Sequence, residues 1–141
     1  MKILKKIKEF FKGKQPIKEI ILTEKTIKKI CGLAKDTHPK EYLAFLEGRI
    51  IGNKVTITDI LFQPYVANEN STWGYIDLPL TSSVMGSIHS HPGYNNKPSR
   101  ADLHLFGKTG IVHGIIKKPY KPEDLAIYDN YGNKLQFKTK E

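Results

Sequence analysis

The chain has 141 residues, a length typical of one domain and long enough to bury a substantial core. Its single cysteine, Cys31, excludes a disulfide framework and favours a reducing, cytoplasmic location, and no apolar run is long enough to span a membrane. The net charge is +9, but residues 1–14 hold six lysines against one glutamate and only two basic residues are arginines, so nucleic-acid binding is not expected as the main role.

Residues 1–15 are interpreted as a basic amphipathic extension of the domain. Apolar side chains recur there at spacings of three and four between lysines, which predicts a helix. These side chains are Ile3, Leu4, Ile7, Phe10 and Phe11. Such a helix could use residues 1–14 to contact an anionic membrane surface or a partner, or it could pack loosely on its own domain. Pro16 follows, and we expect the globular domain to span residues 16–141.

The domain is predicted to begin with a strand and a helix. Residues 17–22 are rich in isoleucine, and Thr23 is suited to cap the helix that follows. The apolar stripe of this helix ends before Pro39 and consists of Ile27, Ile30, Cys31 and Ala34. Cys31 is therefore interpreted as a core residue and not as a nucleophile.

The remaining elements are mostly strands. The sequence predicts one further helix, over residues 99–106. Extended segments are predicted at 42–46, 49–51, 54–62, 73–78, 84–89, 111–116, 125–128 and 134–137. Because strands outnumber helices and do not alternate with them regularly, the pattern predicts an α+β fold, a mixed sheet packed by two or three helices.

The strongest chemical signal is the run His89-Ser90-His91-Pro92 at the end of a predicted strand. Alternate residues of a strand share a face, so the two imidazoles are expected on one side, where they suit zinc. Asp102 could supply a third ligand from the next helix and leave a fourth position for water. Alternatively, Ser99 and Asp102 match a helix capping box, in which Asp102 bonds to backbone N–H groups and needs no metal. Asp102 could not easily serve both roles fully.

A hydrolytic metal site also needs a base that accepts the proton of the attacking water. Glu41 is the best candidate, because it follows His38-Pro39 and opens an apolar strand. Glu47 lies on the same strand face by parity but at its far end. Spacing alone does not decide between the two carboxylates.

The histidine run, followed by Ser99 and Asp102, resembles the full motif of the JAMM (MPN-plus) zinc metalloproteases, and most closely their compact archaeal members. The stretch from His38 to Gly48 resembles the glutamate-bearing strand of that family, and the similarity covers roughly residues 17–138. The resemblance implies the JAMM/MPN fold, which is cytidine deaminase-like. All five motif positions are filled, as in the active members of the family.

Roles for individual residues follow from this resemblance. His89, His91 and Asp102 would bind Zn²⁺, Glu41 would deprotonate water, and Ser99 would donate a hydrogen bond to the oxyanion. The substrate would be a peptide or isopeptide bond after the C-terminal glycines of a ubiquitin-like modifier. Processing of a sulfur-carrier protein and a non-catalytic scaffold remain open as alternatives.

Other segments receive weaker expectations. The polar stretches 68–74 and 93–97 are hypothesised to help form a channel for the modifier's tail, and the alternative is that they are ordinary surface loops. Turned about 200° from Asp102 on its helix, His104 is not expected to be a ligand. His113, in an apolar strand, is interpreted as a core histidine, and His38 is assigned no role.

Overall fold

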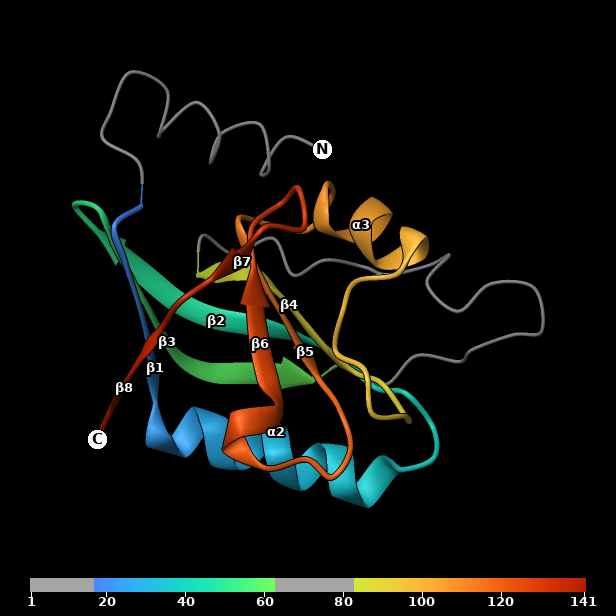
Figure 1. Ribbon diagram of the computed structural model, residues 1–141. Helices are drawn as coiled ribbons and strands as arrows, with labels where there is room; N and C mark the ends of the chain where they lie inside the picture. The colour runs from blue at the N-terminus through green and yellow to red at the C-terminus, as the bar shows by residue number, and fades with distance from the viewer. Residues whose placement is uncertain (1–16, 63–82) are drawn as a thin grey trace.

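The computed structural model describes residues 17–62 and 83–141, which form one mixed sheet of eight strands with an α-helix on each side (Figure 1). The order across the sheet is β7-β6-β5-β4-β2-β3-β1-β8. The strands are β1 (Glu19–Thr23), β2 (Leu43–Ile51), β3 (Lys54–Phe62), β4 (Val84–Ser90), β5 (Val112–Ile116), β6 (Leu125–Tyr128), β7 (Lys134–Leu135) and β8 (Lys138–Lys140). The helices are α2 (Glu24–Thr37), α3 (Arg100–Phe106) and the short 3-10 helix η1 (Pro122–Asp124). The predicted α+β class is confirmed.

Helix α2 covers one face of the sheet and the main core lies beneath it. The Thr23 side chain caps this helix by accepting the N–H of Thr26 at 3.2 Å, as the sequence predicted. The predicted stripe is buried, and Cys31 lies within it among core residues. Together with branched side chains of the central strands, the stripe forms the larger of two apolar clusters.

Helix α3 lies on the opposite side of the sheet (Figure 1). A smaller apolar cluster holds α3 against this face. In this cluster, Phe106 packs with residues of β5 and β6. These residues are Ile115, Ala126 and Tyr128. The side chains of β4 and β5 alternate between faces, so His89, opposite Ile115 in the register, belongs to the α3 side. The candidate site is therefore separated from the main core by the sheet itself.

Several strand predictions need correction. The segments 42–46 and 49–51 belong to one strand, β2, which continues through a register shift at Glu47/Gly48. There, a Cβ on Gly48 would lie 2.0 Å from the carbonyl oxygen of Thr56, so only glycine allows the strands to approach this closely. Strand β7 is shorter than predicted, and β8 and η1 were not predicted. The predicted helix in residues 1–14 and strand at 73–78 lie outside the described residues.

His113 is a buried core histidine, as predicted. Its Nε2 donates to Oδ1 of Asn130 at 2.7 Å, so its Nδ1 accepts a hydrogen bond from the Ser87 hydroxyl at 2.8 Å. The ring stacks on Phe106, with centroids 4.3 Å apart. Burial lowers the pKa of His113 to about 4, although the bond to Asn130 acts in the opposite direction.

This pKa predicts acid sensitivity of the fold. Because unfolded His113 takes up a proton near pH 6.5 and the folded residue does not until about pH 4, stability is complete above pH 6.5 and falls below it. We expect metal-free protein to lose about 2 kcal/mol of unfolding free energy between pH 7 and pH 5 from this residue. Urea titrations at several pH values give the unfolding free energy of wild type and of His113→Gln. The contribution of His113 is the difference between the two slopes of this free energy against pH. Parallel slopes would contradict the assignment.

None of the helices in the described parts of the chain has the length and apolar character needed to cross a membrane.

Candidate metal centre

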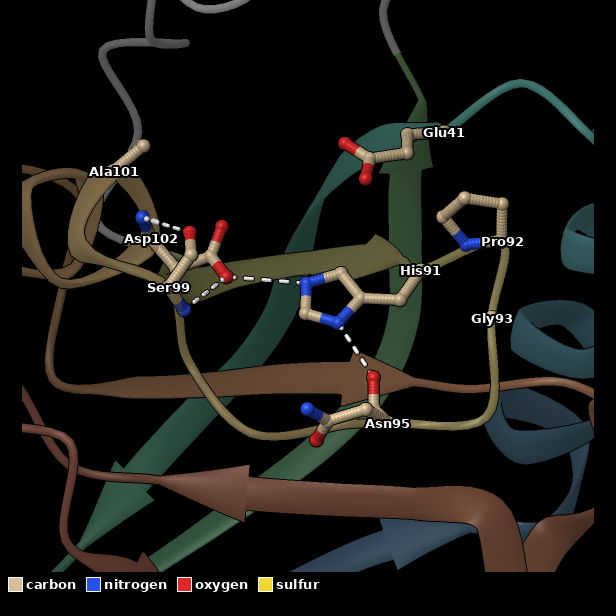
Figure 2. A pocket seen from close by; sticks show the side chains of 8 residues that line it. All are labelled: Glu41, His91, Pro92, Gly93, Asn95, Ser99, Ala101 and Asp102. Atoms are coloured by element: carbon tan, nitrogen blue, oxygen red, sulfur yellow. Dashed lines mark hydrogen bonds and ion pairs between the residues drawn. The ribbon is translucent and has the colours of Figure 1, made fainter.

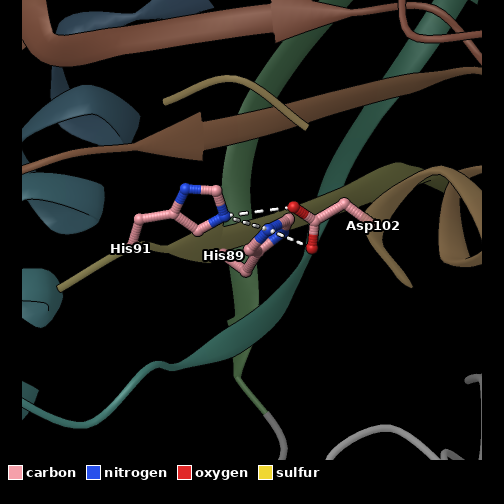
Figure 3. A group of neighbouring side chains, drawn as sticks. All are labelled: His89, His91 and Asp102. Carbon is pink, nitrogen blue, oxygen red and sulfur yellow. Dashed lines mark hydrogen bonds and ion pairs between the residues drawn. The ribbon is translucent and has the colours of Figure 1, made fainter. Parts of the chain in front are cut away.

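Two imidazoles meet one carboxylate where β4 ends. His89 is on β4 and His91 follows the strand directly, so their side chains emerge on the same side, as predicted (Figure 3). Their Nε2 atoms are 3.3 Å apart. Nε2 of His89 lies 2.9 Å from Oδ1 of Asp102, and Nε2 of His91 lies 3.1 Å from Oδ2. His89 and Asp102 are buried, whereas His91 is partly open to solvent.

Asp102 reaches this position because it is the third residue of α3. The Ser99 side chain accepts the N–H of Asp102 at 3.1 Å, and Oδ2 of Asp102 accepts the N–H of Ser99 at 2.8 Å. The capping box is therefore complete, yet both carboxylate oxygens also face imidazoles. The expectation that Asp102 could not easily serve both roles was too strict, because a carboxylate has two oxygens and several lone pairs.

The position of the proton on His91 favours metal binding. Its Nδ1 lies 2.7 Å from the carbonyl oxygen of Asn95, which can only accept, so Nδ1 carries the proton. Nε2 is then the nitrogen that faces the Asp102 carboxylate at 3.1 Å, and either a proton or a metal cation between the two atoms would satisfy both. Hydrogen bonding of the distal nitrogen to a carbonyl is the usual way in which proteins orient a histidine ligand.

The donor spacing fits a tetrahedral zinc ion. Bonds of about 2.0–2.1 Å place two ligands of such an ion about 3.3 Å apart. The nitrogen–nitrogen separation, 3.3 Å, has this value, and the two nitrogens lie 2.9 and 3.1 Å from different oxygens of the Asp102 carboxylate. Among the described residues, His89, His91 and Asp102 form a group able to hold a metal, with ligand atoms all within 4.8 Å of one another.

The electrostatics of the group favour bound positive charge. Burial disfavours ionisation of Asp102, but the two imidazoles and the Ser99 N–H outweigh it and hold the pKa of this carboxyl far below its ordinary value. Burial likewise disfavours protonation of His91, but Asp102 and the Asn95 carbonyl outweigh it and raise the pKa of His91. The carboxylate is thus ionised at neutral pH and attracts a cation to the site.

An open cleft of about 430 Å³ gives access to the group (Figure 2). Its lining residues are Glu41, His91, Pro92, Gly93, Asn95, Ser99, Ala101 and Asp102. The exposed Glu41 carboxylate projects into the space that His91 and Asp102 face (Figure 2). Glu41 lies two residues before β2 and not on the strand, whereas Glu47 lies beyond this cleft, beside the register shift.

The register of the sheet fixes where Glu41 lies. Leu43 of β2 is opposite His89 of β4, and the Tyr42 N–H donates to the Ser90 hydroxyl at 3.0 Å. The distance between Glu41 and the His89–His91 pair is therefore set by two adjacent antiparallel strands. Spacing in the sequence could not reveal this pairing.

The other histidines take no part in the metal group. His104 is exposed on α3, and His38 is hydrogen-bonded to Tyr120. The sequence did not reveal the contact of Asn95 with His91, because it is made through the backbone carbonyl, which every residue possesses. Of the predicted channel segments, 93–97 contributes Gly93 and Asn95 to the cleft, while 68–74 lies outside the described residues.

Fold and site together define a small α+β domain in which two histidines and one aspartate, a group able to hold one metal ion, meet at the end of the central strand β4. A family model described as prokaryotic homologs of the JAB domain matches residues 23–130. A probable metalloprotease of Haloferax volcanii is 41% identical over an alignment of 105 residues, and the alignment covers 69% of this chain and 65% of the relative. The chain thus spans slightly less than two thirds of that relative.

Solved structures agree with this relationship. A JAB1/MPN domain protein from Archaeoglobus fulgidus is 28% identical, with a TM-score of 0.69 over 85% of this chain and 98% of its own. A second structure, described as JAMM, a metalloprotease-like zinc site in the proteasome and signalosome, is 27% identical, with a TM-score of 0.67 over 88% of this chain and 100% of its own. The chain belongs to the JAB/MPN (JAMM) family, and zinc is the metal that its centre fits.

Proposed function

We propose that the protein is a zinc-dependent peptidase that cleaves the peptide or isopeptide bond after the C-terminus of a ubiquitin-like modifier. One observation carries the proposal. His89, His91 and Asp102 converge on one point, and the Glu41 carboxylate and Ser99 hydroxyl line the same cleft. The similarity to a probable metalloprotease and to a JAMM zinc site supports the same class of reaction.

The ligands proposed for zinc are His89, His91 and Asp102. A zinc ion held there would polarise the scissile carbonyl and lower the pKa of water. Asn95 and Ser99 orient two of the three ligands through hydrogen bonds of 2.7 and 2.8 Å. Rigid support of this kind keeps the ligands in place when substrate enters.

Glu41 is proposed as the general base. Its carboxylate faces the ligand group across open solvent, where it can accept a proton from the attacking water and pass it to the leaving amine (Figure 2).

Ser99 is proposed to stabilise the oxyanion. Its oxygen already accepts the N–H of Asp102, so its own hydroxyl proton can point into the cleft. A positioned donor of this kind is worth about 2.7–4 kcal/mol in the transition state. The capping role of Ser99 therefore prepares its catalytic role.

The substrate class rests on the form of the cleft. It is open, and the backbone of the loop that contains Gly93 and Asn95 lines it, so an extended tail with small residues can lie against it. The glycine-rich C-terminus of a ubiquitin-like modifier is such a tail. A cytoplasmic location, consistent with the buried free thiol of Cys31, belongs to the same proposal.

A panel of substrates tests the function. Purified zinc-loaded protein is incubated with linear modifier fusions, lysine-linked modifier conjugates and sulfur-carrier fusions, and the products are identified by mass spectrometry. We expect cleavage after the terminal glycine and loss of activity with a chelator, followed by recovery when zinc is added. Cleavage of carrier fusions alone would favour the sulfur-carrier alternative, and no cleavage by protein with a full complement of zinc would favour a scaffold.

The domain boundary is also a proposal, with residues 1–15 as an extension and 16–141 as the catalytic domain. Deletion of residues 2–14 should leave kcat on a soluble modifier fusion within about twofold of the full chain, because every residue assigned to the site lies beyond it. Steady-state kinetics of the two proteins provide the test. A collapse of kcat would place the basic segment within the catalytic domain.

A further inference from the structure

The hydroxyl of Tyr120 lies between two segments that carry the active site. It is 3.1 Å from the carbonyl oxygen of His91 and 2.8 Å from Nδ1 of His38. His91 belongs to the ligand group, and His38 is three residues before Glu41. One buried side chain thus joins the segment that contains the base to the backbone of a ligand.

The directions of these two bonds follow from the donor inventory. A carbonyl oxygen can only accept, so the single phenolic proton of Tyr120 goes to His91. The phenolic oxygen must then accept from Nδ1–H of His38. The rings of His38 and Tyr120 also meet edge-on, with centroids 5.7 Å apart and an interplanar angle of 61°. The contact is therefore directional.

Glu41 is held from its other side as well. The Tyr42 N–H donates to the Ser90 hydroxyl at 3.0 Å, and the Ser90 N–H donates to the Tyr42 carbonyl at 3.2 Å. Ser90 lies between the two histidine ligands. The short segment that carries Glu41 is thus fixed at both ends to the strand end that carries the ligands.

The backbone of Tyr120 is unusual in a way that agrees with a functional role. Its φ angle is +69°, the left-handed region that bulky side chains rarely adopt. Such a conformation costs on the order of 1–3 kcal/mol and persists only where surrounding contacts hold it. Here the Tyr120 N–H donates to the Lys117 carbonyl at 2.9 Å, and the side chain is only 4% exposed.

We propose that Tyr120, acting through His38, is a positioning residue that holds Glu41 at a fixed place relative to the metal ligands. This inference rests on the proposed function, in which Glu41 is the base. Neither Tyr120 nor His38 is among the residues that line the cleft, so their effect on the reaction is indirect. Misplacement of a catalytic group by 1 Å can cost about 100-fold in rate.

Tyr120→Phe tests the proposal, because it removes the hydroxyl and keeps the ring. We expect kcat on a linear ubiquitin-like modifier fusion to fall roughly tenfold, with KM and zinc affinity within about twofold of wild type. Zinc affinity is measured by competition with a chromophoric chelator. An equal loss in zinc affinity, or an unchanged kcat, would overturn the positioning role.

His38 provides a second, exposed position where folding is not at risk. His38→Ala should reproduce the loss in kcat, and His38→Asn should restore most of it, because the asparagine amide can donate from nearly the place of Nδ1. The double variant Tyr120→Phe/His38→Ala should be no slower than the slower single variant, since both changes remove one connection. Additive losses would contradict a shared pathway.

Thr109→Val is the matched control. The buried hydroxyl of Thr109 also donates to a backbone carbonyl, that of Leu105, at 3.0 Å, and the residue is neither in the cleft nor in the segment that carries Glu41. We expect it to lower thermal stability as much as Tyr120→Phe does while kcat stays within about twofold. If both variants lose kcat equally, the effect of Tyr120 is one of general stability and the proposal fails.

Hydrogen exchange separates this proposal from the proposed function. In metal-free protein, we expect Tyr120→Phe to accelerate exchange in a peptide covering residues 38–44, and Thr109→Val to leave exchange in that peptide unchanged. If wild type cleaves no modifier fusion but exchange responds as described, the proposed peptidase function is wrong. The connection of Tyr120 and His38 to the segment of Glu41 then still holds. Unchanged exchange in 38–44 would refute the connection itself, whatever the activity.

Discussion

Glu41→Gln should bind zinc as tightly as the wild type and lose about 100- to 10,000-fold in kcat, the usual contribution of a general base. The glutamine side chain has nearly the same shape but cannot accept a proton from water. Because Glu41 is exposed and is outside the group of ligand atoms, its replacement should disturb neither the fold nor the metal. Zinc content by elemental analysis and kcat on a modifier fusion are the two measurements.

Glu47→Gln is the matched control for this experiment. It makes the same chemical change at the rival carboxylate, which lies on β2 beside the register shift and outside the cleft. We expect its kcat to stay within about twofold of wild type. If Glu41→Gln retained activity and Glu47→Gln lost it, the assignment of the base would be reversed.

Asp102→Ala should abolish zinc binding and destabilise α3 at the same time. The carboxylate contacts both imidazoles and also accepts the Ser99 N–H, so one substitution removes a ligand and half of a capping box. Loss of an outer-shell partner costs about 10–100-fold in metal affinity, and loss of a ligand should cost more. Loss of the cap should lower the unfolding free energy of metal-free protein by about 1 kcal/mol.

Two variants separate these effects. In Asp102→Asn the amide oxygen can still accept the Ser99 N–H, so zinc binding should be lost while metal-free stability is largely kept. Asp124 is the equivalent residue of a second capping arrangement, where its carboxylate accepts the Lys121 N–H at 2.9 Å. Asp124→Ala should therefore lose stability and keep zinc. Tight zinc binding by Asp102→Ala would disprove its role as a ligand.

Much of the fold could be predicted because local chemistry and burial agree. Three correct predictions depend on residues that are close in the sequence. They are the common side of His89 and His91, the helix caps Thr23 and Ser99, and the apolar stripe of α2. Strand β8 could not be predicted, since Lys138–Lys140 are all exposed and carry no apolar alternation. Pairing with β1 gives this segment its structure.

The sequence predicted that His89, His91 and Asp102 lie together, but it did not predict the contacts that support them. Spacing could not decide between Glu41 and Glu47, because the choice depends on which residues of β2 and β4 are opposite each other. Asn95 supports His91 through a backbone carbonyl. Tyr120 donates a hydrogen bond to His91 from a position 29 residues away in the sequence. Neither kind of contact leaves a pattern in one sequence.

The tight turn between β2 and β3 has a practical consequence. Gly52 adopts a φ of +61° there and is exposed, with no atom within 4 Å of where a side chain would begin. The register shift at Glu47/Gly48 separates this hairpin tip from the Leu43–His89 pairing beside the base. Extra residues added at the tip need not alter the spacing between Glu41 and the proposed metal ligands. The hairpin is thus a suitable place to graft a recognition peptide or a fluorescent reporter onto the protein.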